Sequence, residues 1–525
     1  MAKRGFLAGV TVLASAVALA AAGAPARAQT GTELLRASLN SDIRSTQPGG
    51  NRDFNTDVVL IHVVEGLVAL NENAEPVPML AESVDLSPDR LTYTFHLRSG
   101  VGFHNGQPLT SAEVLWSLKR YLLPATQWRC LPDVDGTSGI AKVVAVEAPD
   151  ARTVTIRVEK PAALLLSTLA RPDCGGTAIL HPSSVGPDGS WIGPVGTGPY
   201  RLGEWRRGQY VELERFDGYA IRPGGTDGLA GGKRAEARRV RFLFIPDSSA
   251  AKAALLAGNI DVMSDIPAAE LSELRARPEV SVLGVPTMGL TGFLFQTRDP
   301  LLKDERIRRA IALSLDAPEI VAGIVDRDAP PNPSPLPIAS PFHSEAQSKR
   351  PPRDLTEAKR LLAQAGYRGQ TIRMLTNRRY PNVYDASLAA QAMVAEAGIK
   401  MELDVLDWAT TIDRYSRGDY QAMAFIYSSR LEPSLSYEMV SGPKDTQPRK
   451  VWEDAEALAL IQKSMETTDK VARQAIFDDL FRLFMRQVPM VVLFNQVDYV
   501  AARKNIRGVK PWASAQLRLW NVSRD

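Results

Sequence analysis

Between residues 354 and 427 helical and strand patterns alternate, and this alternation restricts the possible folds more than any other feature of the chain. Asp354 and Glu357 have capping-box spacing, and an apolar stripe of helical period follows them as far as Gly366. Strand patterns at 371–376, 400–406 and 421–427 enclose a helix at about 384–397 and a shorter helix before the last strand. Such a β-α-β-α-β order requires a mostly parallel sheet with crossover helices, so we predict an α/β fold.

The rest of the chain follows a different pattern, rich in strands between about residues 58 and 245. Alternating apolar residues predict strands at 91–97, 153–158, 210–216 and 239–245. A helix is expected from Ser111, as its N-cap, to Leu123. The glycine-rich stretch 223–232 has little apolar content and is predicted to be a flexible surface loop. We also expect one long helix at about 453–486, followed by a strand at 490–494.

Residues 1–28 have the layout of a secretory signal peptide. Lys3 and Arg4 precede an uncharged stretch, and Ala26-Arg27-Ala28 supplies the small residues of a cleavage site, so we expect cleavage after Ala28. An uncleaved membrane anchor is the alternative, because the apolar run is about long enough to span a bilayer. No later segment approaches ~18 consecutive apolar residues, so we expect a soluble, exported mature protein.

Two cysteines, Cys130 and Cys174, lie in the part of the chain that would be exported. In an oxidising compartment such an isolated pair more often forms a disulfide than stays reduced, so a disulfide is the favoured interpretation. Two buried free thiols and a metal site are the alternatives. A metal would need further ligands, and the sequence near the cysteines offers only His181 and no C-x-x-C.

The sequence contains none of the catalytic motifs that are recognisable without a structure. It has no G-x-S-x-G elbow, no H-E-x-x-H and no G-x-x-x-x-G-K-[ST] phosphate loop. The 525 residues include 62 Lys and Arg against 59 Asp and Glu, a balance that excludes a protein whose main task is to bind nucleic acid. We therefore expect no enzyme, no cofactor, no metal and no nucleic-acid partner.

Six blocks of sequence, taken in order along the chain, carry a resemblance to a known family. They are EGLV at 65–68 with PMLAES at 78–83, LTYTFHLRSGV at 91–101 with FHNGQPLT at 103–110, PVGTGPY at 194–200, ALLAGNID at 254–261, DERIRRAI at 304–311 and AKRLLAQAGY at 358–367. These blocks resemble the extracytoplasmic solute-binding proteins of family 5, the dipeptide-, oligopeptide- and nickel-binding components of ABC importers. The second block ends at Thr110, which has the spacing of a helix capping box with Glu113.

The resemblance implies two α/β lobes with mixed sheets that close over a solute in a cleft between them. After the signal peptide (1–28), lobe I would comprise residues 29–288 in two subdomains, lobe II residues 289–494, and a C-terminal segment, 495–525, would return to lobe I. The chain would then be a monomeric periplasmic protein that captures a small solute, peptide or peptide-like, and delivers it to the permease of an ABC transporter. A secreted hydrolase and a solute-sensing chemoreceptor adaptor are the alternative functions.

The resemblance also indicates where the solute would be held. Peptide-binding members place an aspartate that binds the peptide's ammonium group after the last strand of the β-α-β-α-β run, where this chain has Ser429 or Arg430. If Arg430 faces the cleft, it would favour a carboxylate or phosphate on the solute. If Arg430 faces solvent instead, Glu432 would take the anchoring role. Tyr427 and Trp408 are the expected aromatic walls, with simple core packing as the alternative for each.

Overall fold

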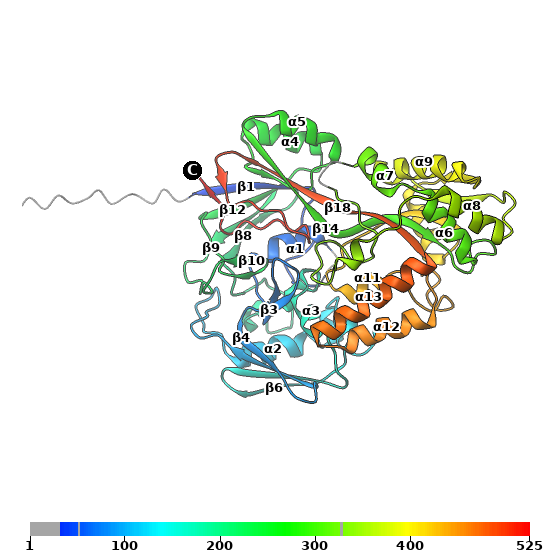
Figure 1. Cartoon of the computed structure of the whole chain (residues 1–525). Helices are drawn as coiled ribbons and strands as arrows, with labels where there is room; N and C mark the ends of the chain where they lie inside the picture. Colours follow the sequence, from blue (N-terminus) through cyan, green and yellow to red (C-terminus); the bar gives the residue numbers. More distant parts are fainter. Residues whose placement is uncertain (1–31, 51–52, 326–328) are drawn as a thin grey trace, which may run out of the picture.

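The computed structural model describes residues 32–50, 53–325 and 329–525, and its largest element is a ten-stranded mixed sheet (Figure 1). The strand order is β16-β15-β17-β14-β18-β13-β1-β12-β9-β8. The first lobe contributes β1 (Leu34–Leu39), β8 (Tyr200–Arg206), β9 (Tyr210–Arg215), β12 (Arg239–Phe244) and β13 (Val262–Met263). The second lobe contributes β15 (Ile372–Thr376), β16 (Met401–Val405) and β17 (Ala422–Tyr427). The predicted signal peptide, residues 1–28, lies outside the described residues.

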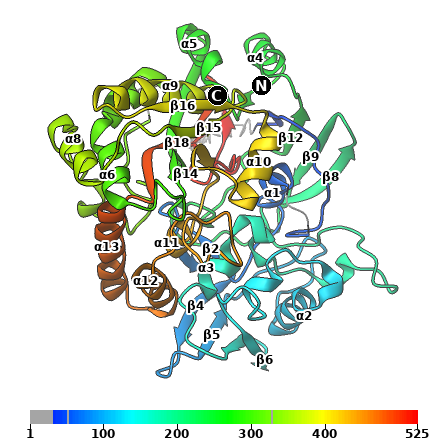
Figure 2. The same cartoon turned by 90° about the vertical axis from the view of Figure 1, so that its right-hand side faces the viewer.

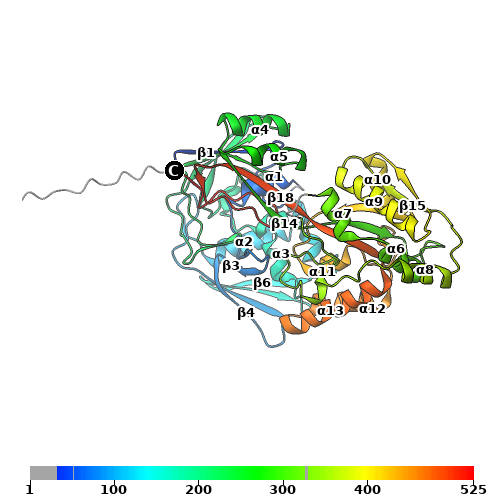
Figure 3. The same cartoon turned by 45° about the horizontal axis from the view of Figure 1, so that its top comes forward.

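Two long strands, β14 (Val280–Phe295) and β18 (Met490–Arg503), join the two groups. They are antiparallel neighbours, and we call them the crossing strands because each spans both lobes, β14 leading into the second lobe and β18 leading back (Figure 3). Their register shifts between Pro286 and Leu290, opposite Gln496. Asn495 secures this irregularity by donating a side-chain hydrogen bond of 3.0 Å to the carbonyl of Gly289. The chain therefore passes between the lobes inside one hydrogen-bonded ribbon.

The predicted α/β region is confirmed in the second lobe. β15 pairs in parallel with both β16 and β17. Helix α8 (Leu355–Gln364) precedes β15, and the helices α9 (Pro381–Glu396) and α10 (Trp408–Arg417) connect the three strands. Asp354 caps α8 by accepting a hydrogen bond from the backbone nitrogen of Glu357 at 2.9 Å. Figure 2 views the molecule from the side of this lobe, with α6 (Glu305–Ser314), α8 and α9 above α12 (Ala455–Glu466) and α13 (Lys470–Gln487). Helix α7 (Ala317–Ile324) also belongs to this lobe.

A second sheet, in the order β4-β5-β7-β6, forms the lower part of the first lobe in Figure 1. Its strands are β4 (Ala81–Leu86), β5 (Thr92–Leu97), β6 (Val143–Asp150) and β7 (Thr153–Val158). Helix α2 (Ser111–Tyr121) packs against it, and its N-cap is Thr110, so the expectation of Ser111 as the cap is wrong by one residue. Thr110 and Glu113 form the predicted capping box. The hydroxyl of Ser111 is engaged elsewhere, donating to the carbonyl of Asp150.

The other short elements complete the lobes. In the first lobe these are α1 (Phe54–Leu60), β2 (Val68–Leu70), β3 (Pro76–Pro78), α3 (Leu165–Ala170), β10 (Thr226–Asp227), β11 (Ala230–Gly231), α4 (Ser248–Ala257) and α5 (Ala268–Ala276). α11 (Pro433–Glu438) follows β17, and β19 (Ile506–Arg507) pairs with β20 (Ser523–Arg524). The C-terminal segment packs on the first lobe, where the backbone nitrogen of Leu519 donates to Nε2 of buried His62 at 2.9 Å.

Three sequence-based expectations about these elements need correction. The single long helix at 453–486 is two helices, α12 and α13, because Asp469 starts a new helix by accepting from the backbone nitrogen of Ala472 at 2.7 Å. The strand expected at 490–494 continues to Arg503, because its second half pairs with β14. The stretch 223–232, predicted to be a flexible surface loop, contains a small hairpin in which Leu229 and Ala230 are buried. The backbone nitrogen of Leu229 donates a hydrogen bond of 2.8 Å to the carbonyl of Leu70, which holds the hairpin against the first lobe.

Among the helices of the described residues, none combines the length and the apolar content required to cross a bilayer.

Candidate functional site

A cavity of about 730 Å³ lies where the lobes and the crossing strands meet. We call it the interlobe cavity. The first lobe lines it with Asp53, Phe54, Asp57, Arg129, Asp133, Ser138, Ile140, Arg171, Pro172, Asp173 and Asp265. The second lobe adds Ser428, Ser429, Arg430, Leu431, Glu432, Leu435, Glu438 and Met465. The crossing strands and the C-terminal segment complete it with Thr287, Gln496, Val497, Asp498, Ser514, Ala515 and Gln516.

The lining of this cavity is strongly acidic. Eight of its residues are Asp or Glu and only three are Arg, although the whole chain is nearly balanced in charge. A concave site lined mainly by one sign of charge concentrates groups of the opposite sign. The formal charge of the lining is thus opposite in sign to that of Arg430, which would favour an anion if it faces the solute.

Two of the three guanidinium groups in the lining are already paired with carboxylates of the first lobe. Arg171 contacts Asp133 at 2.9 Å and Asp173 at 2.8 Å, and Arg129 contacts the same oxygen of Asp173 at 2.9 Å. Burial favours the protonated carboxyl of Asp173, but the hydrogen bond and charge of Arg171 outweigh it and hold the pKa of Asp173 below its ordinary value. This wall of the cavity thus contains a fixed network of alternating charges.

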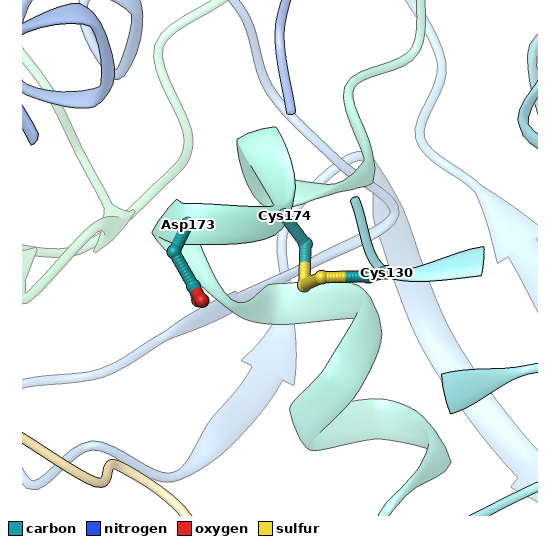
Figure 4. A group of neighbouring side chains, drawn as sticks. All are labelled: Cys130, Asp173 and Cys174. Carbon is teal, nitrogen blue, oxygen red and sulfur yellow. A yellow bond between two sulfur atoms is a disulfide. The ribbon is translucent and has the colours of Figure 1, made fainter. Parts of the chain in front are cut away.

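A disulfide between Cys130 and Cys174 lies beside this network (Figure 4). Cys174 and Asp173 belong to the same short segment, Pro172–Thr177, so the cross-link fixes the position of an ionised residue in the cavity wall. One sulfur of each cysteine and one carboxylate oxygen of Asp173 lie within 4.8 Å of one another, a spacing that would suit a metal ion. Because the two sulfurs are bonded to each other, they are not available as thiolate ligands.

The structure brings three of the predicted site residues, Ser429, Arg430 and Glu432, into the lining of the cavity. Arg430 follows β17, and its Nη1 donates to the hydroxyl of Ser428 at 2.9 Å and to the carbonyls of Ser428 and Ser429 at 3.2 Å. These bonds hold the guanidinium against its own loop.

Glu432 is held by other parts of the second lobe. It is the N-cap of α11, accepting from the backbone nitrogen of Ser434 at 3.0 Å, and its carboxylate forms a buried ion pair with Arg473 of α13. Arg473 in turn donates to the carbonyl of Ser464 at 2.8 Å, at the end of α12. Glu432 therefore connects three helices, and its charge is neutralised within the chain.

Tyr427 and Trp408 are not brought to the cavity lining with the other predicted residues. They lie in an aromatic cluster of the second lobe, in which the ring of Trp408 stacks on Phe425 at 6.1 Å between centroids. The hydroxyl of Tyr415 donates to that of Tyr427 at 3.3 Å, and burial raises the pKa of Tyr427 well above its ordinary value.

Two carboxylates that sequence reasoning missed lie in the cavity wall. Asp57, on α1, is only 5% exposed, and Asp498, on β18, is half-buried beside Asp265. Burial, with a smaller contribution from the charge of Asp265, raises the pKa of Asp498 to about 7. A usable signal for Asp57 was present: it is an acidic residue at the start of an apolar run that leads into the EGLV block.

Comparisons with known proteins agree on one family. The family described as "Bacterial extracellular solute-binding proteins, family 5 Middle" matches residues 75–447. The "Probable D,D-dipeptide-binding periplasmic protein DdpA" of Escherichia coli K12 is 25% identical over 440 residues, which cover 82% of this chain and 81% of that protein. The glutathione-binding protein GsiB of the same strain is 26% identical over 373 residues, 70% of this chain and 69% of that protein.

The fold agrees as well. The solved structure of HbpA2 from Haemophilus parasuis superimposes with a TM-score of 0.80 at 22% sequence identity, over 94% of this chain and 100% of that one.

Proposed function

Because the chain belongs to family 5 of the bacterial extracellular solute-binding proteins, we propose that it captures a peptide or peptide-like solute for an ABC importer. The substrate-binding role in transport follows from the family. The observation that supports a small solute is the interlobe cavity, whose volume of about 730 Å³ lies in the range of small-molecule sites. Relatives named for D,D-dipeptides and glutathione support a solute of two or three residues.

The proposed arrangement assigns different roles to the predicted residues. Ser429 and Arg430, which line the cavity, contact the solute, and Arg430 contacts its carboxylate. Tyr427 and Trp408 support that loop through the aromatic cluster, and Glu432 secures it through Arg473. The lobes correspond to residues 29–288 and 289–494, with 495–525 returning to lobe I, and the protein acts as a monomer that meets a permease in the membrane.

Ligand-dependent stabilisation tests the proposed function. A solute at a hundredfold excess over its Kd adds about 2.7 kcal/mol to the free energy of unfolding. For a chain of this length that corresponds to a rise of about 2–3 °C in Tm. We expect such a rise from at least one of D-alanyl-D-alanine, glutathione and a set of L-di- and tripeptides, measured by differential scanning calorimetry. Sugars, metal chelates and aromatic acids serve as comparison classes.

Two outcomes would contradict the proposal. A rise in Tm with one of the comparison classes, and with no peptide, would show that the protein binds a solute of that other class. Chemical conversion of the bound peptide, followed by chromatography, would favour the secreted hydrolase, since we propose binding without turnover. The Arg430→Ala variant adds a control for the site: we expect it to weaken binding of a free-acid peptide about thirtyfold or more, and to leave the corresponding peptide amide much less affected.

Export and cleavage of the precursor are a separate proposal. The charged residues Lys3 and Arg4, the apolar stretch and Ala26-Arg27-Ala28 support cleavage after Ala28 and location in the periplasm. We expect the intact mass of the protein from a periplasmic fraction to correspond to a chain that begins at Gln29. Recovery of the full-length mass from the membrane fraction would instead favour the uncleaved anchor.

A further inference from the structure

Asp57 differs from the other carboxylates of the interlobe cavity in how deeply it is buried without a counter-charge. Asp57 lies on the first turn of α1 and is 5% exposed to solvent. Within residues 32–50, 53–325 and 329–525, no group donates a hydrogen bond to its side chain and no cation pairs with it. Buried carboxylates are normally paired or hydrogen-bonded, because removing such a group from water is costly.

The surroundings of Asp57 make its charge still less favourable. Burial raises the pKa of Asp57 the most, and the nearby carboxylates of Asp173 and Asp53 raise it further, whereas Arg129 lowers it. Arg129 is itself engaged with Asp173 at 2.9 Å, and Arg171 is shared between Asp133 and Asp173. The cations of this wall are therefore committed to other carboxylates, and a positive charge is what the position of Asp57 lacks.

The neighbouring geometry leaves room for such a charge. Asp57 lines the interlobe cavity of about 730 Å³. It also lines a small cavity of about 30 Å³ with Glu65 and Lys233, which has the room for one water molecule. Glu65 and Lys233 are paired with each other at 3.2 Å, so Lys233 is also committed.

We propose that Asp57 binds the ammonium group of the solute and selects solutes that carry a primary amine. The assignment rests on the proposed function, because it names the part of the solute that the same cavity recognises. It places the anchor for the amine on α1 of the first lobe, whereas the loop Ser428–Glu432 of the second lobe offers Arg430 and a Glu432 already neutralised by Arg473. In the protein without solute, the pKa of Asp57 is raised to about 8, and a bound ammonium would supply the counter-charge that restores the ionised form.

Paired solutes test the assignment without altering the protein. D-alanyl-D-alanine, glutathione and the L-peptides are each compared with their N-acetyl derivatives by isothermal titration calorimetry at pH 7.5. Acetylation removes the positive charge and leaves the rest of the solute unchanged. We expect the acetylated form of the best solute to bind at least about thirtyfold more weakly to the natural protein.

The Asp57→Asn variant tests the residue itself. It should bind the amine-bearing solute at least about thirtyfold more weakly and should bind the acetylated and free forms with similar affinity. Asp217→Asn is the matched control, because it removes an exposed carboxylate that pairs with Arg215 outside the cavity lining, and its affinity should equal that of the natural protein. Circular dichroism confirms that each variant is folded.

The results that would overturn the assignment differ from those that would overturn the proposed function. Affinities within threefold for the free and acetylated solutes, or for the natural protein and Asp57→Asn, mean that Asp57 does not bind the amine. Binding by no peptide in either form contradicts the proposed function, and the assignment falls with it unless an amine that is not a peptide binds through Asp57. Putrescine is included as an amine without a peptide bond. If putrescine binds tightly and loses affinity in Asp57→Asn, Asp57 does bind an ammonium group, and the solute that carries this group is a polyamine.

Discussion

Replacing both Cys130 and Cys174 by alanine lowers the free energy of unfolding by about 4 kcal/mol. The disulfide closes a loop with a sequence separation of 44, and in the chain-entropy model a cross-link of this length restricts the unfolded chain by about that amount. Urea denaturation followed by circular dichroism measures the change. The midpoint should fall, and the slope should rise slightly because the unfolded chain exposes more surface.

Reduction of the natural protein provides the control for this variant. Cys130 and Cys174 are 1% and 0% exposed, so a reductant should act on the bond only when the protein opens. Protein reduced in urea and refolded with its thiols blocked from oxidation should match the double alanine variant to within about 1 kcal/mol. Equal stability of the oxidised protein and the alanine variant would show that the cross-link contributes little beyond packing.

Asp57→Asn should make the protein more stable, and the gain should grow with pH. Because the folded-state pKa of Asp57 is raised from 3.8 to about 8, the folded protein retains a proton that the unfolded chain releases above about pH 4. The favourable contribution of this proton is complete below pH 4 and is lost as the pH rises to 8, at about 1.4 kcal/mol per pH unit. Asparagine does not titrate, so the variant should exceed the natural protein by up to about 5 kcal/mol at pH 8.5.

Urea denaturation at pH 5, 7 and 8.5 measures this difference. Asp498, whose pKa is raised to about 7, also makes the natural protein less stable as the pH rises, but it is present in both proteins and cancels in the comparison. Asp217→Asn should follow the natural protein at every pH. Stability curves for Asp57→Asn and the natural protein that stay parallel between pH 5 and 8.5 would show that Asp57 has an ordinary pKa in the folded state.

The sequence predicted the parts of the fold that depend on local periodicity. The parallel arrangement of β15, β16 and β17 followed from alternating helical and strand patterns with short connections. The break between α12 and α13 was missed although two local signals mark it: residues 466–470 are all polar, and Asp469 supplies a cap. The second half of β18 was missed because its partner, the first half of β14, is distant in sequence, and local pattern does not reveal such pairing.

The part of the candidate site that could be predicted from the sequence is the part formed by the single loop after β17. The stretch from Ser429 to Glu432 follows β17 directly, so its place at the cavity could be expected from the strand pattern and the resemblance. That Glu432 pairs with Arg473 could not be expected, since the contact joins two helices that local patterns do not bring together. The apolar run after Asp57 sets this carboxylate apart in the sequence, but its place in the cavity wall could not be predicted, because that wall includes segments far along the chain.

The ribbon formed by β14 and β18 has a kinetic consequence. Because the crossing strands are hydrogen-bonded to each other on both sides of their irregularity, the lobes cannot slide past one another and should move mainly by rotation about the region between Pro286 and Leu290. Thr287, Gln496 and Asp498 line the cavity near this axis, so they are displaced least as the lobes approach. A solute should therefore contact these three residues before the lobes close, and these contacts should determine its association rate. The contacts to α1 and to the loop after β17 form on closure and should determine its residence time.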